Sequence, residues 1–586
     1  MDVVDTKHGA SMPTHAQALP IEGPVSNIPP VMQISEDILT SIFFHILANH
    51  LSTATPAPNV FKGSPATLVS HVCKAWRELS LATPMLWSSI LLSLLRYPEM
   101  QESMDDHERD KRRWHIKMKS AHDALQAWLP RSGDCPLSIV LSGFEEFDTT
   151  NEKACSGVNS LLLTLGTTAS RWKDVHICLG PSWNTNVERV CSLPQLSAAS
   201  VPLLRSLTVE GSATTQPPVT AQHGEREIHV PLAILGAPSL RSLSLGPTCH
   251  YPLGGLPVNW SNLYHLTIQG YEFPLKESAS SRAVLCPFET LMLLKSCPNL
   301  LTADVAIEYP DLLTSPEYSS SKATLSNLHS LTIRFTIPDR EFISTLSLPS
   351  LRILRFFDIP APRPTTELSA TDIPPMARWI RAYGAQLEEI HFPYDTLATE
   401  HVLEECMEHI RDVKVLGLGK DTQVGGVGEW GPMIEDPEQP LREAWQSSLS
   451  DLLLENLTPV FNESDHDGQT LQRPCWCPHL QKLSFTLAGE SPKHSNADVV
   501  RRAARLVGGR RKRAAGIALL ENVTFTTDFA KLRGTSILQG LVLDSVDLED
   551  LKLEMRYGAI SDKAMPRPRN RVYMSTTQTI STRPDV

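Results

Sequence analysis

The sequence has no uninterrupted apolar stretch near the roughly 18 residues that a membrane-spanning helix needs. Its first 30 residues hold no basic segment followed by an apolar one, so we expect no secretory signal. The sequence also has no excess of basic residues, because its 53 Lys and Arg are outnumbered by 65 Asp and Glu, which gives a net charge of -12. A chain with this net charge does not attract nucleic acids or other anionic polymers over its whole surface. Neither a membrane nor a nucleic acid is therefore expected as a partner.

Motifs of the common enzyme classes are also missing. There is no Gly-x-Ser-x-Gly elbow, no His-Glu-x-x-His helix and no phosphate-binding Gly-Lys-Ser/Thr loop. Residues 463–468 follow the start of a calcium loop, but the twelfth position is Pro474 instead of a bidentate Glu. Cys475, Cys477 and His479 lack a second ligand pair at zinc-finger spacing. We expect no catalytic site, no metal and no other cofactor.

Paired cysteines are not indicated, since the 11 cysteines are odd in number and spread along the chain. They fit reduced thiols, and we expect a cytoplasmic or nuclear protein.

One basic cluster has two interpretations that the sequence leaves open. It is either a nuclear import signal or a patch for an acidic partner, or it is the exposed side of a helix. Its members are Arg501, Arg502, Arg505, Arg510, Arg511, Lys512 and Arg513.

The N-terminal part divides into a polar segment and a compact helical module. Residues 1–30 are Pro-rich and are expected to lack a fixed structure. Residues 31–92 hold two apolar patterns at helical spacing and a Thr83-Pro84 helix start. Three short helices cannot bury all these apolar side chains against one another, so some should face a neighbour or a partner.

The order of residues in this module resembles an F-box, in particular the fungal branch of that family. The resemblance rests on Ile34-Ser35-Glu36-Asp37-Ile38-Leu39, on Val72-Cys73-Lys74-Ala75-Trp76-Arg77 and on Thr83-Pro84-Met85-Leu86-Trp87. It implies a three-helix domain that binds a Skp-type adaptor and, through it, a cullin. The residues then expected on the adaptor surface, or in the core that supports it, are Ile34, Ile38, Leu39, Ile42, Phe43, Val72, Cys73 and Trp76.

A linker helix is expected within residues 93–135. A charged run precedes Trp114, Met118, Ala121, Leu125 and Trp128, which recur at steps of three and four. The helix should stop before Pro130, and a strand should follow from Pro136.

A six-residue pattern, apolar-x-x-apolar-x-apolar, recurs at irregular intervals through residues 136–556. It occurs at 172–177, 204–209, 240–245, 263–268, 300–305, 328–333, 351–356, 387–392, 413–418, 449–454, 480–485 and 520–525. This resembles the leucine-rich repeat, in which each unit adds one short parallel strand to a stack. The capping Asn of that repeat is mostly absent, so the units would be degenerate. The alternative is an α/β domain with scattered strands.

The sequence thus predicts an α/β fold in which a three-helix F-box is followed by an irregular leucine-rich-repeat solenoid and, after residue 557, a flexible tail. The resemblance implies a substrate-recognition subunit of an SCF-type cullin-RING ubiquitin ligase. The repeats would bind a protein target whose identity the sequence does not give. The chain itself would not be an enzyme. The alternative is a scaffold that binds the adaptor or other proteins without ubiquitination.

Overall fold

The fold is described from a computed structural model of the chain. It describes residues 34–52, 65–93, 97–98, 104–142, 152–179, 196–211, 232–246, 255–270, 285–308, 322–357, 359, 373–397, 399–419, 449–461, 471–473, 475–487, 496–511, 517–527, 551–557 and 577–580. The segment 1–30, the calcium-like residues 463–468 and the basic pair Lys512 and Arg513 lie outside these ranges. Among the described helices, none combines the length and apolar character that a bilayer crossing requires.

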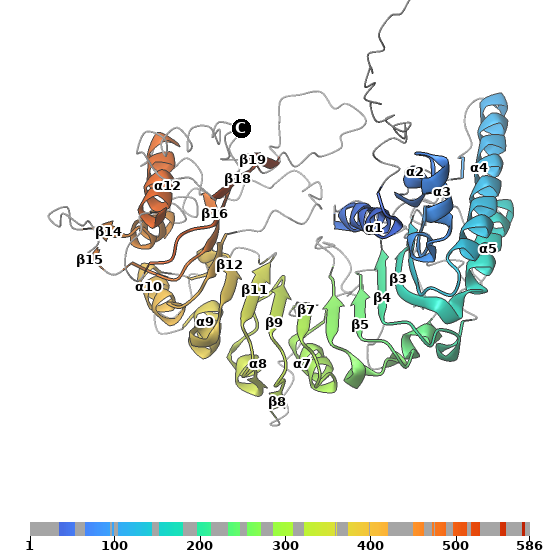
Figure 1. Cartoon of the computed structure of the whole chain (residues 1–586). Helices are drawn as coiled ribbons and strands as arrows, with labels where there is room; N and C mark the ends of the chain where they lie inside the picture. The colour runs from blue at the N-terminus through green and yellow to red at the C-terminus, as the bar shows by residue number, and fades with distance from the viewer. Residues whose placement is uncertain are drawn as a thin grey trace, which may run out of the picture.

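The described chain begins with a small helical module. It consists of α1 (Glu36–Ser52), α2 (Pro65–Ser70), α3 (Lys74–Leu81) and the 3-10 turn η2 (Pro84–Trp87). The long α4 (Met104–Arg131) and α5 (Glu152–Gly166) follow. The linker helix therefore exists, but it runs past Pro130 for one further residue. The module, α4 and α5 together form one end of the molecule (Figure 1).

One 15-stranded sheet connects this end to the rest of the chain. Its strands follow the order of the sequence and pair in parallel, except that β19 is antiparallel to β18. They are β1 (Ser89–Ser93), β2 (Leu137–Ser142), β3 (Trp172–Leu179), β4 (Ser206–Gly211), β5 (Ser242–Leu245), β6 (His265–Ile268), β7 (Thr302–Ala306), β9 (Ser330–Arg334), β11 (Ile353–Phe357), β12 (Glu389–Phe392), β13 (Val415–Leu418), β16 (Lys482–Leu487), β17 (Asn522–Thr527), β18 (Lys552–Tyr557) and β19 (Thr577–Ile580).

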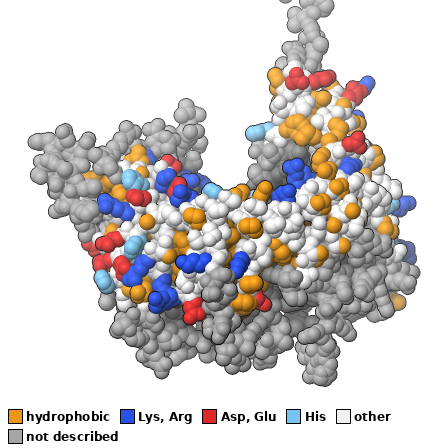
Figure 2. Space-filling view, turned by 90° about the horizontal axis from the view of Figure 1, so that it is seen from below, with side chains coloured by type: hydrophobic (Ala, Val, Ile, Leu, Met, Phe, Trp, Pro, Cys, Tyr) orange, Lys and Arg blue, Asp and Glu red, His pale blue; other side chains and the backbone are white. Residues whose placement is uncertain are grey.

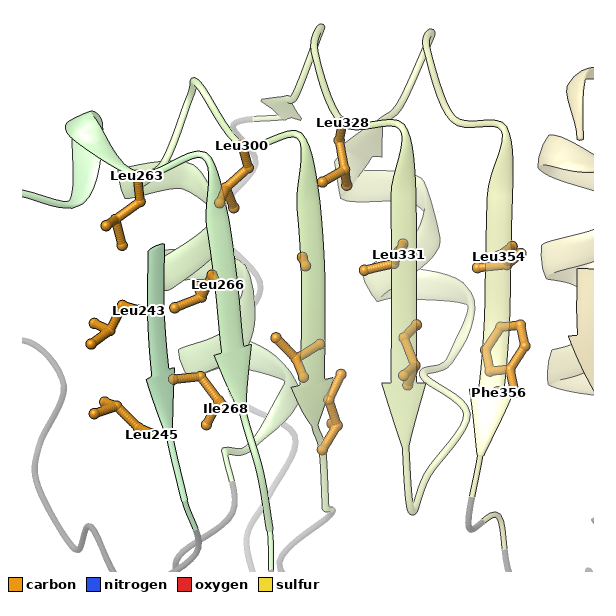
Figure 3. Close-up of a cluster of buried hydrophobic side chains, with 14 of the residues drawn as sticks. Leu243, Leu245, Leu263, Leu266, Ile268, Leu300, Leu328, Leu331, Leu354 and Phe356 are labelled. Carbon is orange, nitrogen blue, oxygen red and sulfur yellow. The ribbon is translucent and has the colours of Figure 1, made fainter. Parts of the chain in front are cut away.

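Apolar residues in register form a continuous row across this sheet. Each of its members is at most 2% exposed, and each is paired with the next. Figure 3 shows the central part of the row, with Leu243 on β5, Leu266 on β6, Leu331 on β9 and Leu354 on β11. The full row is Ile90, Ile139, Val175, Leu207, Leu243, Leu266, Ala303, Leu331, Leu354, Ile390, Leu416, Leu483, Val523 and Leu553. Burying each of the larger side chains contributes roughly 1.5 to 3 kcal/mol.

Short turns and helices cover the apolar side of the sheet. The early units return through the 3-10 turns η7 (Ala198–Ser200), η8 (Leu232–Gly236) and η10 (Trp260–Asn262). Later units return through α7 (Pro287–Ser296), α8 (Arg340–Thr345), α9 (Pro375–Tyr383), α10 (Glu400–His409) and α12 (Asn496–Arg511). Because a 3-10 turn is shorter than a helix, the unit length varies. The result is an open arc with strands on its inner side and helices outside (Figure 1).

Two small sheets lie outside this main one. The strands β8 (Ala323–Thr324) and β10 (Leu346–Ser347) are parallel, and β14 (Val460–Phe461) and β15 (Leu471–Arg473) are antiparallel. The molecule is a mixed α/β protein with a large parallel sheet in a solenoid-like repeat arrangement.

The structure differs from the sequence expectations at three further places. Residues 449–454 are helical rather than a repeat strand. Their leucines also satisfy helical spacing, since Leu449, Leu453 and Leu457 are four residues apart and all are buried. The sheet begins before the expected array, because its first strand is β1, which lies in the segment assigned to the helical module. It also reaches into the segment expected to be a flexible tail, where β19 pairs with β18.

Candidate protein-docking site

The helical module has a buried apolar interior that is continuous with the core of the sheet. Phe43 of α1 is fully buried and meets the ring of Trp76 of α3 edge to face, with ring centroids 5.1 Å apart. Leu39 of α1 and Val69 of α2 are also buried in this core. The spacing of Leu39 and Phe43, one helical turn apart, places both on the inner face of α1. These two residues therefore support the module instead of forming its surface.

Several large apolar side chains of the same module remain exposed. Ile38 and Ile42 lie one turn apart on α1, and they are 55% and 36% exposed. Leu68 at 55% and Val72 at 58% extend this set to α2 and the turn before α3. Met85 of η2 is exposed as well. Apolar side chains left exposed on neighbouring helices of a small module are typical of a surface that docks a protein.

The remaining predicted residues have supporting positions. Ile34 is half-buried and packs against the core. Cys73 begins α3, because its Sγ accepts a hydrogen bond from the backbone N–H of Trp76 at 3.5 Å. Trp76 is half-buried, and its Nε1 has no hydrogen-bond partner among the described residues. The turn that carries Val72 is held by Arg77, whose Nε donates to the carbonyl of Ser70 at 2.9 Å.

A tryptophan pair joins the module to the repeat array. Trp87 of η2 meets Trp128 of α4 edge to face at 4.7 Å, and both rings are buried. The Arg131 guanidinium lies over the Trp87 ring at 4.7 Å. The Trp87 indole N–H donates to the carbonyl of Ser80 at 2.8 Å. Three residues after Trp87, Ile90 begins the buried row of the sheet. The module is thus packed onto the array.

Charged and aromatic side chains line the other face of the sheet in the middle of the arc. Arg334 of β9 makes a bidentate ion pair with Asp304 of β7, at 2.8 and 3.0 Å, and lies over the Phe357 ring of β11 at 5.3 Å. On β12, the Oε1 of Glu389 accepts from Arg355 Nε at 2.6 Å and lies 3.1 Å from His391 Nε2.

The electrostatics of this network favour ionised groups. Desolvation alone would raise the pKa of Glu389, but the hydrogen bond to His391 and the charge of Arg355 outweigh it and hold this pKa below its ordinary value of 4.5. The network has no open ligand position of its own, because Arg355 already occupies the carboxylate that His391 contacts. It forms a surface of mixed charge on this face of the sheet.

A second polar cluster lies on β3 and β4. His176 Nε2 is 3.1 Å from Glu210 Oε2 and 3.3 Å from Cys178 Sγ. Hydrogen bonds to Cys178 and then Glu210 raise the pKa of His176 to about 10. The sequence analysis missed this cluster. The strand alternation His176-Ile177-Cys178 was a usable signal, but the partnership with Glu210 depends on the register between two repeats.

The basic cluster near the C-terminus is divided by the fold. Arg510 is fully buried at the end of α12, where its guanidinium donates to the carbonyls of Leu457 at 2.8 Å, Cys477 at 2.7 Å and Trp476. Burial lowers the pKa of Arg510. The Arg502 guanidinium is 2.7 Å from Asp451. Arg510 is therefore not part of a surface patch, and of the described residues in the cluster Arg501 and Arg505 are the exposed ones.

The cysteines near Trp476 are also placed. Cys475 and Cys477 are buried, and the pKa of Cys477 is raised by burial to about 12. His479 is exposed and its Nε2 is 3.9 Å from Asp412. These residues lie at the start of the repeat unit that contains β16.

On the face seen in Figure 2, acidic and basic side chains are interspersed, and apolar side chains are frequent toward the end that carries α4 and α5.

Comparisons with known proteins give no family. No protein-family model matches the chain, and no curated protein matches it. Among the solved structures that match is a protein from Bacteroides fragilis, 12% identical in sequence, with a TM-score of 0.22. That match covers 77% of this chain and 86% of the other. Likeness at this level supports no argument about function, so the F-box resemblance, including its fungal branch, rests on the sequence motifs.

Proposed function

We propose that this chain is the substrate-recognition subunit of an SCF-type cullin-RING ubiquitin ligase, with an F-box in residues 31–92 and a leucine-rich client-binding array after it. The observation that carries the proposal is the exposure of the apolar side chains of Ile38, Ile42, Leu68 and Val72. Leaving these side chains exposed would be costly without a partner, and they lie within the module that carries the F-box-like motifs. A Skp-type adaptor is the partner that those motifs imply, and it would connect the chain to a cullin.

The mechanism would be proximity. The chain would catalyse nothing, and its role would be to hold a client near an active site on another subunit, which raises the effective concentration of the client lysine. Holding a client in this way works best when the adaptor-binding surface and the client-binding surface keep a fixed distance and orientation. The Trp87 and Trp128 contact and the short step from Trp87 to Ile90 meet this requirement, because they leave little freedom between the module and the first strands.

The client surface is proposed on the polar face of the sheet. The network around Arg334, Phe357 and Glu389 combines an aromatic ring with charges of both signs. Such a surface suits a polar peptide segment that offers hydrogen-bond donors and acceptors together with an apolar side chain.

A co-purification experiment tests the proposal. The tagged full chain is purified from cells with and without proteasome inhibition, and its bound proteins are identified. Recovery of a Skp-type adaptor with a cullin, together with clients that accumulate under inhibition, would support the ligase function. Adaptor without cullin would support the scaffold alternative. Recovery of neither would contradict both.

A further inference from the structure

Three metal-ligating side chains converge near the N-terminal end of the sheet. His176 and Cys178 lie on the same face of β3, two residues apart, and Glu210 of β4 is the register partner of Cys178. One ligand atom from each residue lies within 4.8 Å of the other two. Among the residues that the structure describes, these three are the one group of potential metal ligands that lie this close together. All three side chains are half-buried, so the cluster is reachable from solvent.

The geometry distinguishes a metal site from a nucleophilic triad. In a Cys-His-Glu triad the thiol contacts one imidazole nitrogen and the carboxylate contacts the other. Here Cys178 Sγ and Glu210 Oε2 both approach the same atom, His176 Nε2, at 3.3 and 3.1 Å. That nitrogen cannot relay a proton between them. The three ligand atoms instead lie close enough together for one ion to contact all of them.

We propose that His176, Cys178 and Glu210 bind one Zn²⁺ ion through Nε2, Sγ and a carboxylate oxygen. Zinc is bound by these three ligand types at about 2.0 to 2.3 Å, and tetrahedral ligands at those lengths lie about 3.3 to 3.6 Å apart. The observed separations of 3.1 and 3.3 Å need only a small outward shift. A thiolate with an imidazole selects zinc over magnesium or calcium, which prefer oxygen ligands alone.

Among the described residues, no fourth protein ligand joins His176, Cys178 and Glu210. The register partner of His176 on β4 is Thr208, and its partner on β2 is Val140, so neither strand supplies another strong ligand beside it. A site with three protein ligands on a solvent-reachable face leaves room for water or a group of a bound client. The three ligands lie on the paired strands β3 and β4, so no loop has to become ordered before a metal ion can bind.

Zinc binding at this site would compete with protons. The imidazole and the thiol must lose their protons to become ligands, so binding would release protons to solvent. This inference does not depend on the proposed ligase function.

The chain offers a matched control on the same face of the sheet. His391 Nε2 and Glu389 Oε1 are also 3.1 Å apart, but the third neighbour is the Arg355 guanidinium instead of a thiol. A cation already occupies the carboxylate there, so this pair should not bind metal. A variant of His391 therefore shows whether metal binding needs all three ligands or only a contact between His and Glu.

Cobalt titration of the metal-stripped full chain tests the proposal. We expect one equivalent of Co²⁺ to give a thiolate-to-cobalt absorption band that Zn²⁺ removes. Cys178→Ser should abolish the band, and Glu210→Gln and His176→Gln should weaken binding at least about tenfold. His391→Gln and Cys135→Ser should bind like the wild type.

A thermal measurement complements the titration. Zn²⁺ should raise the melting temperature of the wild type but not of Glu210→Gln, because an ion that binds only the folded chain stabilises it. Each variant is first melted in chelator to show that it folds. A wild type without the band at one equivalent, or a band that persists in folded Cys178→Ser, would overturn the site. If Cys178→Ser does not fold, wild-type affinity in folded Glu210→Gln would overturn it in the same way.

Discussion

The indole rings of Trp87 and Trp128 meet edge to face with their centroids 4.7 Å apart, and this contact joins the helical module to the repeat array. Trp87 ends the last turn of the module, and Trp128 lies in the last turns of the helix that leads into the array. The Arg131 guanidinium covers the Trp87 ring from the same helix. The two parts are therefore expected to unfold together.

Removing one ring of this pair should destabilise the whole chain. Trp128→Ala creates a cavity beside Trp87 and should lower the free energy of unfolding by about 3 to 5 kcal/mol. Trp128→Phe keeps an aromatic ring in place and should cost less. Chemical denaturation followed by tryptophan fluorescence measures both. Equal effects of the two substitutions would contradict the role assigned to this junction.

The buried guanidinium of Arg510 should be a stability determinant. Its three carbonyl partners, on Leu457, Trp476 and Cys477, would lose their donor in Arg510→Met. Because an unsatisfied buried polar group costs about 1 to 3 kcal/mol, the loss should be at least about 3 kcal/mol. The exposed neighbour Arg505 gives the control, and Arg505→Met should change stability by less than about 0.5 kcal/mol. Similar melting temperatures of the two variants would contradict the assigned role.

The Glu389 carboxylate should make stability depend on pH in the acid range. Its pKa in the folded chain is below its ordinary value of 4.5, so its contribution is present above that value and is lost as the pH falls through the folded pKa. The difference in unfolding free energy between the wild type and Glu389→Gln should therefore shrink below about pH 5. Urea denaturation at a series of pH values measures it. A difference that stays constant with falling pH would exclude a depressed pKa for Glu389.

Most of the repeat array could be predicted from the sequence. An apolar-x-x-apolar-x-apolar unit places its last two apolar residues on one face of a strand, as Leu266 and Ile268 show on β6. This alternation is local, so it survives irregular spacing between units. The prediction for 449–454 was wrong because its leucines fit a helical period as well, and only the packing of the neighbouring elements decides between the two.

The polar sites could not be predicted in the same way. The contact of Glu210 with His176 joins residues 34 positions apart, and the spacing between those two units is not regular. A shift of the register by one residue would have turned Glu210 toward the buried side. In the helical module the pattern indicated the helices, but which residues face outward depends on the packing of Phe43 against Trp76.

A direct binding measurement with a purified Skp-type adaptor tests the central claim. Calorimetry with the full chain should give a one-to-one complex, and Ile38→Asp combined with Val72→Asp should weaken it by at least about 2 kcal/mol, or roughly thirtyfold. Both positions are exposed, so the melting temperature should hardly change, and Leu163→Asp on α5, also exposed, should bind like the wild type. Adaptor binding by the folded double variant at wild-type strength, or no binding by the wild type itself, would contradict the proposed docking surface.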